Sequence, residues 1–209
     1  MLKTKGSKVA VQDFIGALVI GKKVLDVGCV QHSAGKARDE TWLHRFIAEN
    51  ASSVLGIDIL EKDVQHLASQ GYRVICADAI RVELPEKFDV IVAGELIEHL
   101  NSPGPFLANM RRHLAPDGVI VITTPNVFYA LHTIESCFFS PQKRWNPEHV
   151  AWYCPFTLDN LFRREGMYLQ DCVYFARSRK IRALLRLLNL PCPGLLASTI
   201  LVTAKVAAP

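Results

Sequence analysis

The sequence contains no CxxC pair and no other cysteine spacing typical of a metal site. Its six cysteines are scattered, at positions 29, 76, 137, 154, 172 and 192. Scattered thiols of this kind are typical of a reducing compartment, where several of them pack inside strands as small hydrophobes. We therefore expect a cytoplasmic protein with reduced cysteines.

The chain also lacks a long apolar run that is free of charge and proline. The apolar stretch near the C-terminus is broken by an arginine, two prolines and a glycine within residues 186–194, so no membrane span is expected there. Near the N-terminus, lysines precede the apolar run FIGALVIG, as in a secretory signal. That run leads directly into Lys22 and Lys23 without a small-residue cleavage pattern, which predicts a leading helix instead.

A strong charge of either sign is absent as well. The formal net charge is +4, and 21% of the residues are charged while 50% are hydrophobic. This globular composition permits an anionic substrate or surface without requiring nucleic acid, so no nucleic-acid partner is expected. With 209 residues and no internal repeat, the chain is predicted to form a single domain over residues 1–209.

Short β-branched runs are present, and they alternate with amphipathic stretches. Five such runs predict consecutive buried strands at residues 23–29, 53–59, 72–77, 88–93 and 118–124. Two later runs, at 168–176 and 199–206, have the lengths of an antiparallel pair at the edge of the sheet. This alternation predicts an α/β fold, a mostly parallel sheet with helices on both faces.

Helix signals lie between these runs. A helix after Ser102 is expected to begin at Pro103 and to end in a turn at residues 116–118, and Thr157 is expected to cap a short helix that Gly166 closes. Residues 125–156 are rich in aromatics, proline and histidine, and they predict an insertion over one end of the sheet. A basic, leucine-rich helix is expected at residues 178–190.

Polar residues follow the predicted strands at the points where the strands end. Asp26 and Gly28 end the first, Asp58 the second, Asp78 the third, and Gly94 with Glu95 the fourth. In an open α/β sheet, ligands bind at the carboxyl ends of the strands, so these residues face one crevice. Each aspartate taken singly has an alternative role as a turn cap, and the ordered set is what indicates a site.

Glycines are missing where a dinucleotide would require them. Gly28 is followed by Val30, Gln31 and His32, and the next glycine is Gly35. A pyrophosphate must approach backbone amides closely, whereas an adenosyl ligand without phosphate does not need that nest. Because ionised carboxylates only accept hydrogen bonds, they suit ribose hydroxyls, an adenine amine and a cationic ligand. S-adenosylmethionine, a sulfonium with an ammonium tail, meets these conditions.

At this point the sequence resembles the class I S-adenosylmethionine-dependent methyltransferases of the small-molecule type. The matching stretches are VLDVGC (24–29), VLGIDI (54–59), VICADA (74–79), FDVIVAGELIEHL (88–100), LAPDGVIVITTPN (114–126) and EHVAWYCPFTLDNLFRREGM (148–167). The resemblance implies a Rossmann-like sheet of seven strands with the last strand antiparallel, and S-adenosylmethionine as the cofactor.

The resemblance also implies which residues hold the cofactor. The loop after Asp26 would hold the methionine part, Asp58 the ribose and Asp78 with Ala79 the adenine, while Gly94 and Glu95 would border the methyl group. The full implied set is Asp26, Gly28, Cys29, Asp58, Ile59, Asp78, Ala79, Gly94 and Glu95. Asp26 and Asp58 lie 32 residues apart, against about 20 in a related nucleotide fold, so residues 30–35 are not assigned one by one.

Candidate catalytic residues are His149, His99 and Glu98. A base is useful when an oxygen or nitrogen acceptor must lose a proton, and histidine suits neutral pH. His149 is the first candidate because it lies in the aromatic insertion, and His99 the second; Glu98 and Glu95 would orient them. Each histidine has a structural alternative as a hydrogen-bonded loop residue.

No catalytic role is expected for His32 and His44, and no metal ion is expected. His32 and His44 are interpreted as surface or capping groups. The spacing of Glu148, His149 and Cys154 matches no standard ligand set, so no metal is expected.

The expected function is therefore methyl transfer from S-adenosylmethionine to an O, N or C atom of a small molecule, such as a sugar, polyketide, quinone or lipid-linked intermediate. Two alternatives remain: a non-catalytic binding subunit with the same fold, and an NAD(P)-dependent oxidoreductase that would need the missing glycines. The basic segment 177–190 either contacts an anionic membrane surface or substrate, or packs its leucines on the sheet. Nothing in the sequence indicates the oligomeric state.

Overall fold

The computed structural model describes residues 4–6, 10–31, 42–138, 146–176, 178, 180, 183, 187 and 194–207. Several predictions lie outside these residues: His32, the loop 29–38 beyond Gln31, and most of the basic helix at 178–190. Among the described residues, none of the helices has the length and apolar character needed to cross a membrane.

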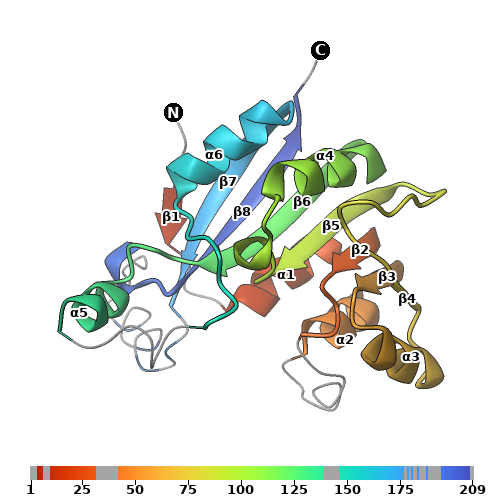
Figure 1. The fold of residues 1–209 in the computed structure, drawn as a ribbon, viewed down its shortest axis with the longest axis horizontal. Helices are drawn as coiled ribbons and strands as arrows, with labels where there is room; N and C mark the ends of the chain where they lie inside the picture. Colours follow the sequence, from red (N-terminus) through yellow and green to blue (C-terminus); the bar gives the residue numbers. More distant parts are fainter. Residues whose placement is uncertain are drawn as a thin grey trace.

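The structure is built on one sheet of eight strands in the order β1-β7-β8-β6-β5-β2-β3-β4 (Figure 1). The strands are β1 (Thr4–Gly6), β2 (Lys23–Val27), β3 (Ser53–Asp58), β4 (Val74–Cys76), β5 (Phe88–Gly94), β6 (Leu114–Pro125), β7 (Met167–Phe175) and β8 (Thr199–Val206). β8 runs antiparallel to β6 and β7, and all other pairs are parallel. The seven predicted strands are confirmed; β1, beside β7 at the edge, was not predicted.

Helices cover both faces of this sheet, as predicted. They are α1 (Val11–Val19), α2 (Leu43–Asn50), α3 (Glu61–Ser69), α4 (Pro103–His113), α5 (Ala130–Phe138) and α6 (Pro155–Arg164), with short 3₁₀ helices η2 (Ile97–His99) and η4 (Gly194–Leu196). Side chains of α4 and α6 share one core with the sheet, and side chains of α1 and α2 share another. The expected leading helix is α1.

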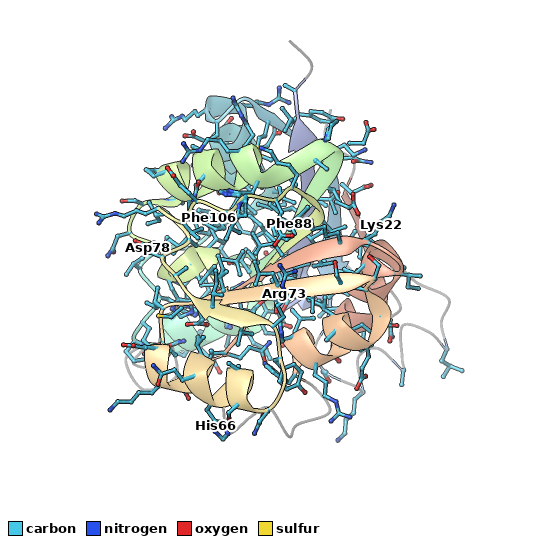
Figure 2. The ribbon with its side chains drawn as sticks, turned by 90° about the vertical axis from the view of Figure 1, so that its right-hand side faces the viewer. Lys22, His66, Arg73, Asp78, Phe88 and Phe106 are labelled. Carbon is cyan, nitrogen blue, oxygen red and sulfur yellow. The ribbon has the colours of Figure 1, made fainter. Side chains whose placement is uncertain are left out.

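Alternation along the central strands explains the two cores. Leu25 and Ile91 pack toward α4 and α6, whereas their neighbours Val24 and Val90 pack toward α1 and α2. Because both faces are covered, successive residues of β2 and β5 are buried and the strands have continuous apolar runs. Phe88 and Phe106 lie in the interior between β5 and α4 (Figure 2).

Two local predictions were wrong by a few residues. β6 begins at Leu114, directly after α4, and the expected turn at 116–118 is an irregularity in the pairing of β5 with β6. α6 begins at Pro155 after Cys154, and Thr157 lies inside its first turn. The Thr157 hydroxyl oxygen accepts the backbone N–H of Cys154 at 3.0 Å, so threonine stabilises the helix start from three residues inside.

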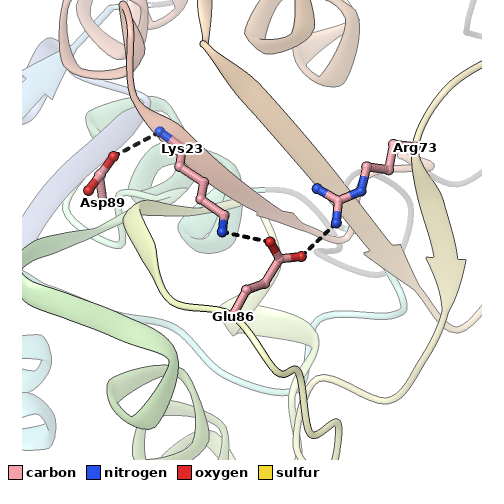
Figure 3. Close-up of polar contacts among 4 residues, drawn as sticks. All are labelled: Lys23, Arg73, Glu86 and Asp89. Carbon is pink, nitrogen blue, oxygen red and sulfur yellow. Dashed lines mark hydrogen bonds and ion pairs between the residues drawn. The ribbon is translucent and has the colours of Figure 1, made fainter.

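A group of four charged residues, Lys23, Arg73, Glu86 and Asp89, connects neighbouring strands near the amino ends of β2, β4 and β5. Glu86 forms ion pairs with Lys23 and Arg73, each at 2.7 Å, and Asp89 accepts the backbone N–H of Lys23 at 2.9 Å (Figure 3). Hydrogen bonding to Lys23, followed by the Arg73 contacts, lowers the pKa of Glu86. This group joins β2 to the segments that precede β4 and β5.

Replacing Glu86 with glutamine should lower the free energy of unfolding by less than about 1 kcal/mol, because water screens pairs this close to the surface. A carboxylate whose pKa is lowered in the fold stabilises above its unfolded pKa, and this contribution disappears as the pH falls through the folded pKa. The difference between E86Q and the parent in urea unfolding should therefore shrink from pH 7 toward acid. A difference that grows on acidification would contradict this account.

Candidate active site

A cavity of about 1150 Å³ opens at the carboxyl ends of the parallel strands. Gly28, Asp58, Ile59, Gly94 and Glu95 line it, and so do Glu98, His99 and His149. Eight of the twelve residues singled out in the sequence thus share one space. The remaining four, Asp26, Cys29, Asp78 and Ala79, do not line it.

Asp58 sits at the end of β3 with its carboxylate held by two backbone amides. Oδ2 accepts the N–H of Val30 at 3.0 Å, and Oδ1 accepts the N–H of Leu60 at 3.1 Å. An ionised carboxylate has about four acceptor positions, so it can still accept two hydroxyl donors from the cavity. The side chain therefore fixes the loop after β2 and presents acceptors to a ligand.

The loop after β2 turns at Gly28, which has φ +79° and whose N–H bonds the carbonyl oxygen of Ile57 at 2.9 Å. A side chain at this left-handed position would be strained, and its Cβ would lie 3.3 Å from Leu96. Cys29 is buried, and this burial raises the pKa of its thiol. Trp42 Nε1–H donates to the Cys29 carbonyl oxygen at 2.8 Å and thereby anchors the loop.

Asp26 does not reach the cavity, because it pairs with a buried histidine. His44 Nδ1 lies 2.8 Å from Asp26 Oδ2, and both side chains are almost fully buried. The interpretation of His44 as a surface or capping group was therefore wrong. His44 shares the inward face of α2 with Leu43 and Ile47, so helical periodicity was the available signal.

Asp78 follows β4 and organises a turn. Its Oδ1 accepts the N–H of Ile80 at 2.8 Å, and Arg81 lies 3.9 Å from Oδ2. The carbonyl oxygen of Ala79 accepts an amide hydrogen bond from Asn109 at 2.9 Å, which ties this turn to α4. The Asp78 carboxylate is half-exposed, so it keeps acceptor positions that are accessible from solvent.

Glu95 has an unusual backbone conformation, with φ +50° for a residue other than glycine. Its N–H is held by Thr123, whose carbonyl oxygen and hydroxyl oxygen both lie 3.0 Å away. Backbone strain of this kind persists only when the surroundings enforce it, and it is frequent at functional sites. Neither this strain nor the role of Thr123 could be read from the sequence.

Glu98, His99 and His149 line the same cavity as Asp58, and their side chains lie close to one another. The loop carrying His149 is fastened to η2 because the carbonyl oxygen of Glu98 accepts the N–H groups of Val150 (2.9 Å) and Ala151 (3.2 Å). Glu98 is 1% exposed, and its Oε2 accepts the hydroxyl of Thr124 at 3.0 Å. Burial, and next the charge of Glu95, raise the pKa of Glu98 to about 8.

Aromatic rings continue from this cluster along the cavity. His99 and His149 meet at 4.7 Å between ring centroids, His149 and Trp152 at 5.6 Å, and Trp152 and His132 at 5.4 Å. His132 belongs to α5, so the predicted insertion contributes a wall of this cavity. Such a wall suits a flat, partly apolar molecule.

Comparison with known proteins is consistent with this site. Residues 9–171 match the sequence profile of a family described as "Methyltransferase domain". The chain is 34% identical over 114 residues to a ubiquinone biosynthesis O-methyltransferase of Pseudomonas fluorescens, and 31% identical over 115 residues to one of Leptothrix cholodnii. Each match covers 51% of this chain and 45% of the relative, so the match spans about half the length of these curated relatives.

Solved structures share the fold at low sequence identity. An S-adenosylmethionine-dependent methyltransferase from Archaeoglobus fulgidus superposes with a TM-score of 0.66 at 19% identity, covering 95% of this chain and 92% of that one. One from Clostridium acetobutylicum gives 0.63 at 13% identity, covering 94% and 91%.

Proposed function

Because this chain belongs to the methyltransferase-domain family, in the class I S-adenosylmethionine-dependent group, we propose that it transfers a methyl group to an oxygen atom of a small aromatic acceptor. S-adenosylmethionine is the cofactor of this group. One observation carries the proposal: a single cavity joins the Asp58 carboxylate to the Glu98, His99 and His149 side chains and to an aromatic wall.

The cofactor half of the cavity is assigned to the strand ends. Asp58 accepts both ribose hydroxyls, the loop at Gly28 and Cys29 holds the methionine part, and Ile59 covers the adenine. Gly94 with Glu95 borders the methyl group. Asp78 and Ala79 do not line the cavity, so they are assigned to the adenine edge only where the adenine extends beyond the cavity lining. Asp26 acts indirectly here, because its bond to His44 fixes the end of β2 from which the loop departs.

The acceptor half is assigned to the described parts of the predicted insertion, residues 125–138 and 146–156, which we propose as a substrate cap; residues 139–145 of that prediction lie outside the described residues. His132, Asn146, Glu148 and Trp152 line the cavity from this segment, and the rings favour a planar acceptor by stacking. The names of the curated relatives favour an oxygen on a quinone-type ring. The acceptor could then stand against His99 and His149, where its hydroxyl proton must leave.

The chemistry needs positioning more than covalent participation. When bound, the cofactor supplies a methyl group on a sulfonium, and a neutral thioether leaves when an acceptor attacks in line. The cavity walls hold the two molecules in contact and exclude water. We propose that the side chains of Glu98, His99 and His149 assist the loss of the hydroxyl proton from the acceptor.

Two measurements test this function. Calorimetry should detect S-adenosylhomocysteine binding to the purified protein, and incubation with labelled S-adenosylmethionine and a panel of phenolic and catecholic compounds should methylate at least one of them. Cofactor binding without transfer to any oxygen, nitrogen or carbon acceptor would favour the non-catalytic binding subunit. Absence of both would contradict the proposal.

A further inference from the structure

The three side chains at the acceptor end form a cluster with the composition of a metal site. One potential ligand atom from each of Glu98, His99 and His149 lies within 4.8 Å of the other two. Glu98 and His99 are consecutive in η2, while His149 comes from a loop fifty residues further along the chain. The bonds from Val150 and Ala151 to the Glu98 carbonyl oxygen hold this loop in place.

Glu98 provides an independent indication that a ligand belongs here. Its side chain is 99% buried, and Oε2 is bonded to Thr124, but Oε1 is buried without a hydrogen-bond partner among the residues that the structure describes. A buried carboxylate oxygen without a partner is costly, and native proteins rarely leave one. A cation placed between the three side chains would satisfy it.

His99 is already oriented to act as a ligand. Its Nδ1 lies 3.2 Å from the carbonyl oxygen of Glu148. A carbonyl oxygen only accepts, so the tautomer of the neutral ring that fits this contact has its proton on Nδ1 and its lone pair on Nε2. A histidine that donates one ring N–H to a backbone carbonyl while the other nitrogen coordinates is a recurring feature of metal sites, as is a ligating carboxylate held by a further hydrogen bond.

We propose that Glu98, His99 and His149 bind a divalent transition-metal ion of the zinc type. Two imidazoles and one carboxylate are a common ligand set for catalytic zinc, whereas Mg²⁺ and Ca²⁺ prefer oxygen ligands alone. All three residues line the cavity, so a position on the ion is left for a molecule bound there. A lone surface cluster would not have this opening toward the proposed acceptor.

The catalytic role of this ion rests on the proposed function, whereas the binding of the ion does not. An acceptor hydroxyl bound to the ion loses its proton to solvent more easily. A lone pair of that oxygen then forms the new C–O bond, the C–S bond breaks, and sulfur keeps the bonding pair as a neutral thioether. His99 and His149 are then ligands and not general bases, which replaces the roles expected for them from the sequence.

Metal binding is measured on the full chain, without an affinity tag and after treatment with a chelator. Zn²⁺ titrations by calorimetry, and Co²⁺ titrations followed by visible absorption, should show one ion per chain. H99A, H149A and E98Q should weaken Zn²⁺ binding by more than about 100-fold, since even loss of an outer-shell partner costs about 10–100-fold. T124V, which removes only the hydrogen bond to Glu98, should weaken it by about tenfold.

Two matched histidine variants control for non-specific uptake. His66 lies on the exposed side of α3, and His132 lines the same cavity outside the cluster. H66A and H132A should bind Zn²⁺ like the parent. The metal site is refuted if the parent takes up no more Zn²⁺ or Co²⁺ than the H99A/H149A double variant, or if H66A lowers uptake as much as H99A does.

Cofactor binding in the presence of the chelator separates this inference from the proposed function. Binding of S-adenosylhomocysteine by the parent, together with absent metal uptake, would overturn the metal site alone. Binding of S-adenosylhomocysteine by each variant would show that the variant is folded. Metal uptake without any cofactor binding would overturn the proposed function and leave the metal site standing.

Discussion

Replacing Asp58 with alanine should raise the dissociation constant for S-adenosylhomocysteine by about 100-fold or more. Two hydrogen bonds to a charged acceptor are lost, each worth about 1.5–3 kcal/mol, and every 1.4 kcal/mol is tenfold in affinity. The substitution also frees the N–H groups of Val30 and Leu60, which now have the carboxylate as their acceptor. The loop that we propose to hold the methionine part should loosen as a result.

Calorimetry on D58A, D58N and a control variant tests this effect. D58N keeps one carbonyl acceptor and should lie between the parent and D58A. Asp117 is an exposed aspartate near the amino end of β6, whereas the cavity opens at the carboxyl ends of the parallel strands, so D117A should bind like the parent. Equal affinity of D58A and D117A, with circular dichroism showing both folded, would contradict the assignment of Asp58 to the cofactor.

Replacing Trp42 with alanine should lower the free energy of unfolding by about 3–5 kcal/mol, the cost typical of truncating a buried aromatic residue. The ring is 1% exposed and packs against Tyr72 at 4.9 Å and His44 at 5.3 Å between centroids. The substitution would also remove the donor to the Cys29 carbonyl oxygen. Urea unfolding followed by circular dichroism measures the loss.

Trp42→Phe separates the packing of the ring from its hydrogen bond. It keeps most of the apolar contact and should cost less than half as much as W42A. Because Trp42 holds the loop after β2, both variants should also bind S-adenosylhomocysteine more weakly than the parent. Loss of stability in W42A with unchanged cofactor affinity in both variants would show that the loop does not depend on this anchor.

The fold could be predicted closely because its signals are local. Strands buried on both faces must be apolar at successive positions, as in Val90 and Ile91, and this pattern needs no tertiary information. Gly166 has a positive φ value where the short helix after Thr157 was expected to end. β1 could not be predicted, since a three-residue edge strand contributes mainly backbone hydrogen bonds and leaves no apolar period in the sequence.

The sequence predicted the residues of the site that follow directly after strands, but not the contacts that depend on how helices pack. The order of Asp58, Gly94 and Glu95 along successive strands was sufficient to place them in one cavity, because parallel strands end on the same side. Asp26 and His44 are different, since their pairing depends on where α2 packs against β2. A sequence does not distinguish an aspartate that faces a ligand from one that faces a buried histidine.

The sequence by itself determined the order of strands and helices, the family resemblance and the acids at the strand ends, because each follows from neighbours along the chain. Tertiary structure alone decided which side chains meet. His149 joins Glu98 and His99 only because a loop from the insertion binds the Glu98 carbonyl oxygen, and Thr124 on β6 then fixes the carboxylate. Contacts between segments fifty residues apart depend on packing and backbone hydrogen bonds, which no local pattern records.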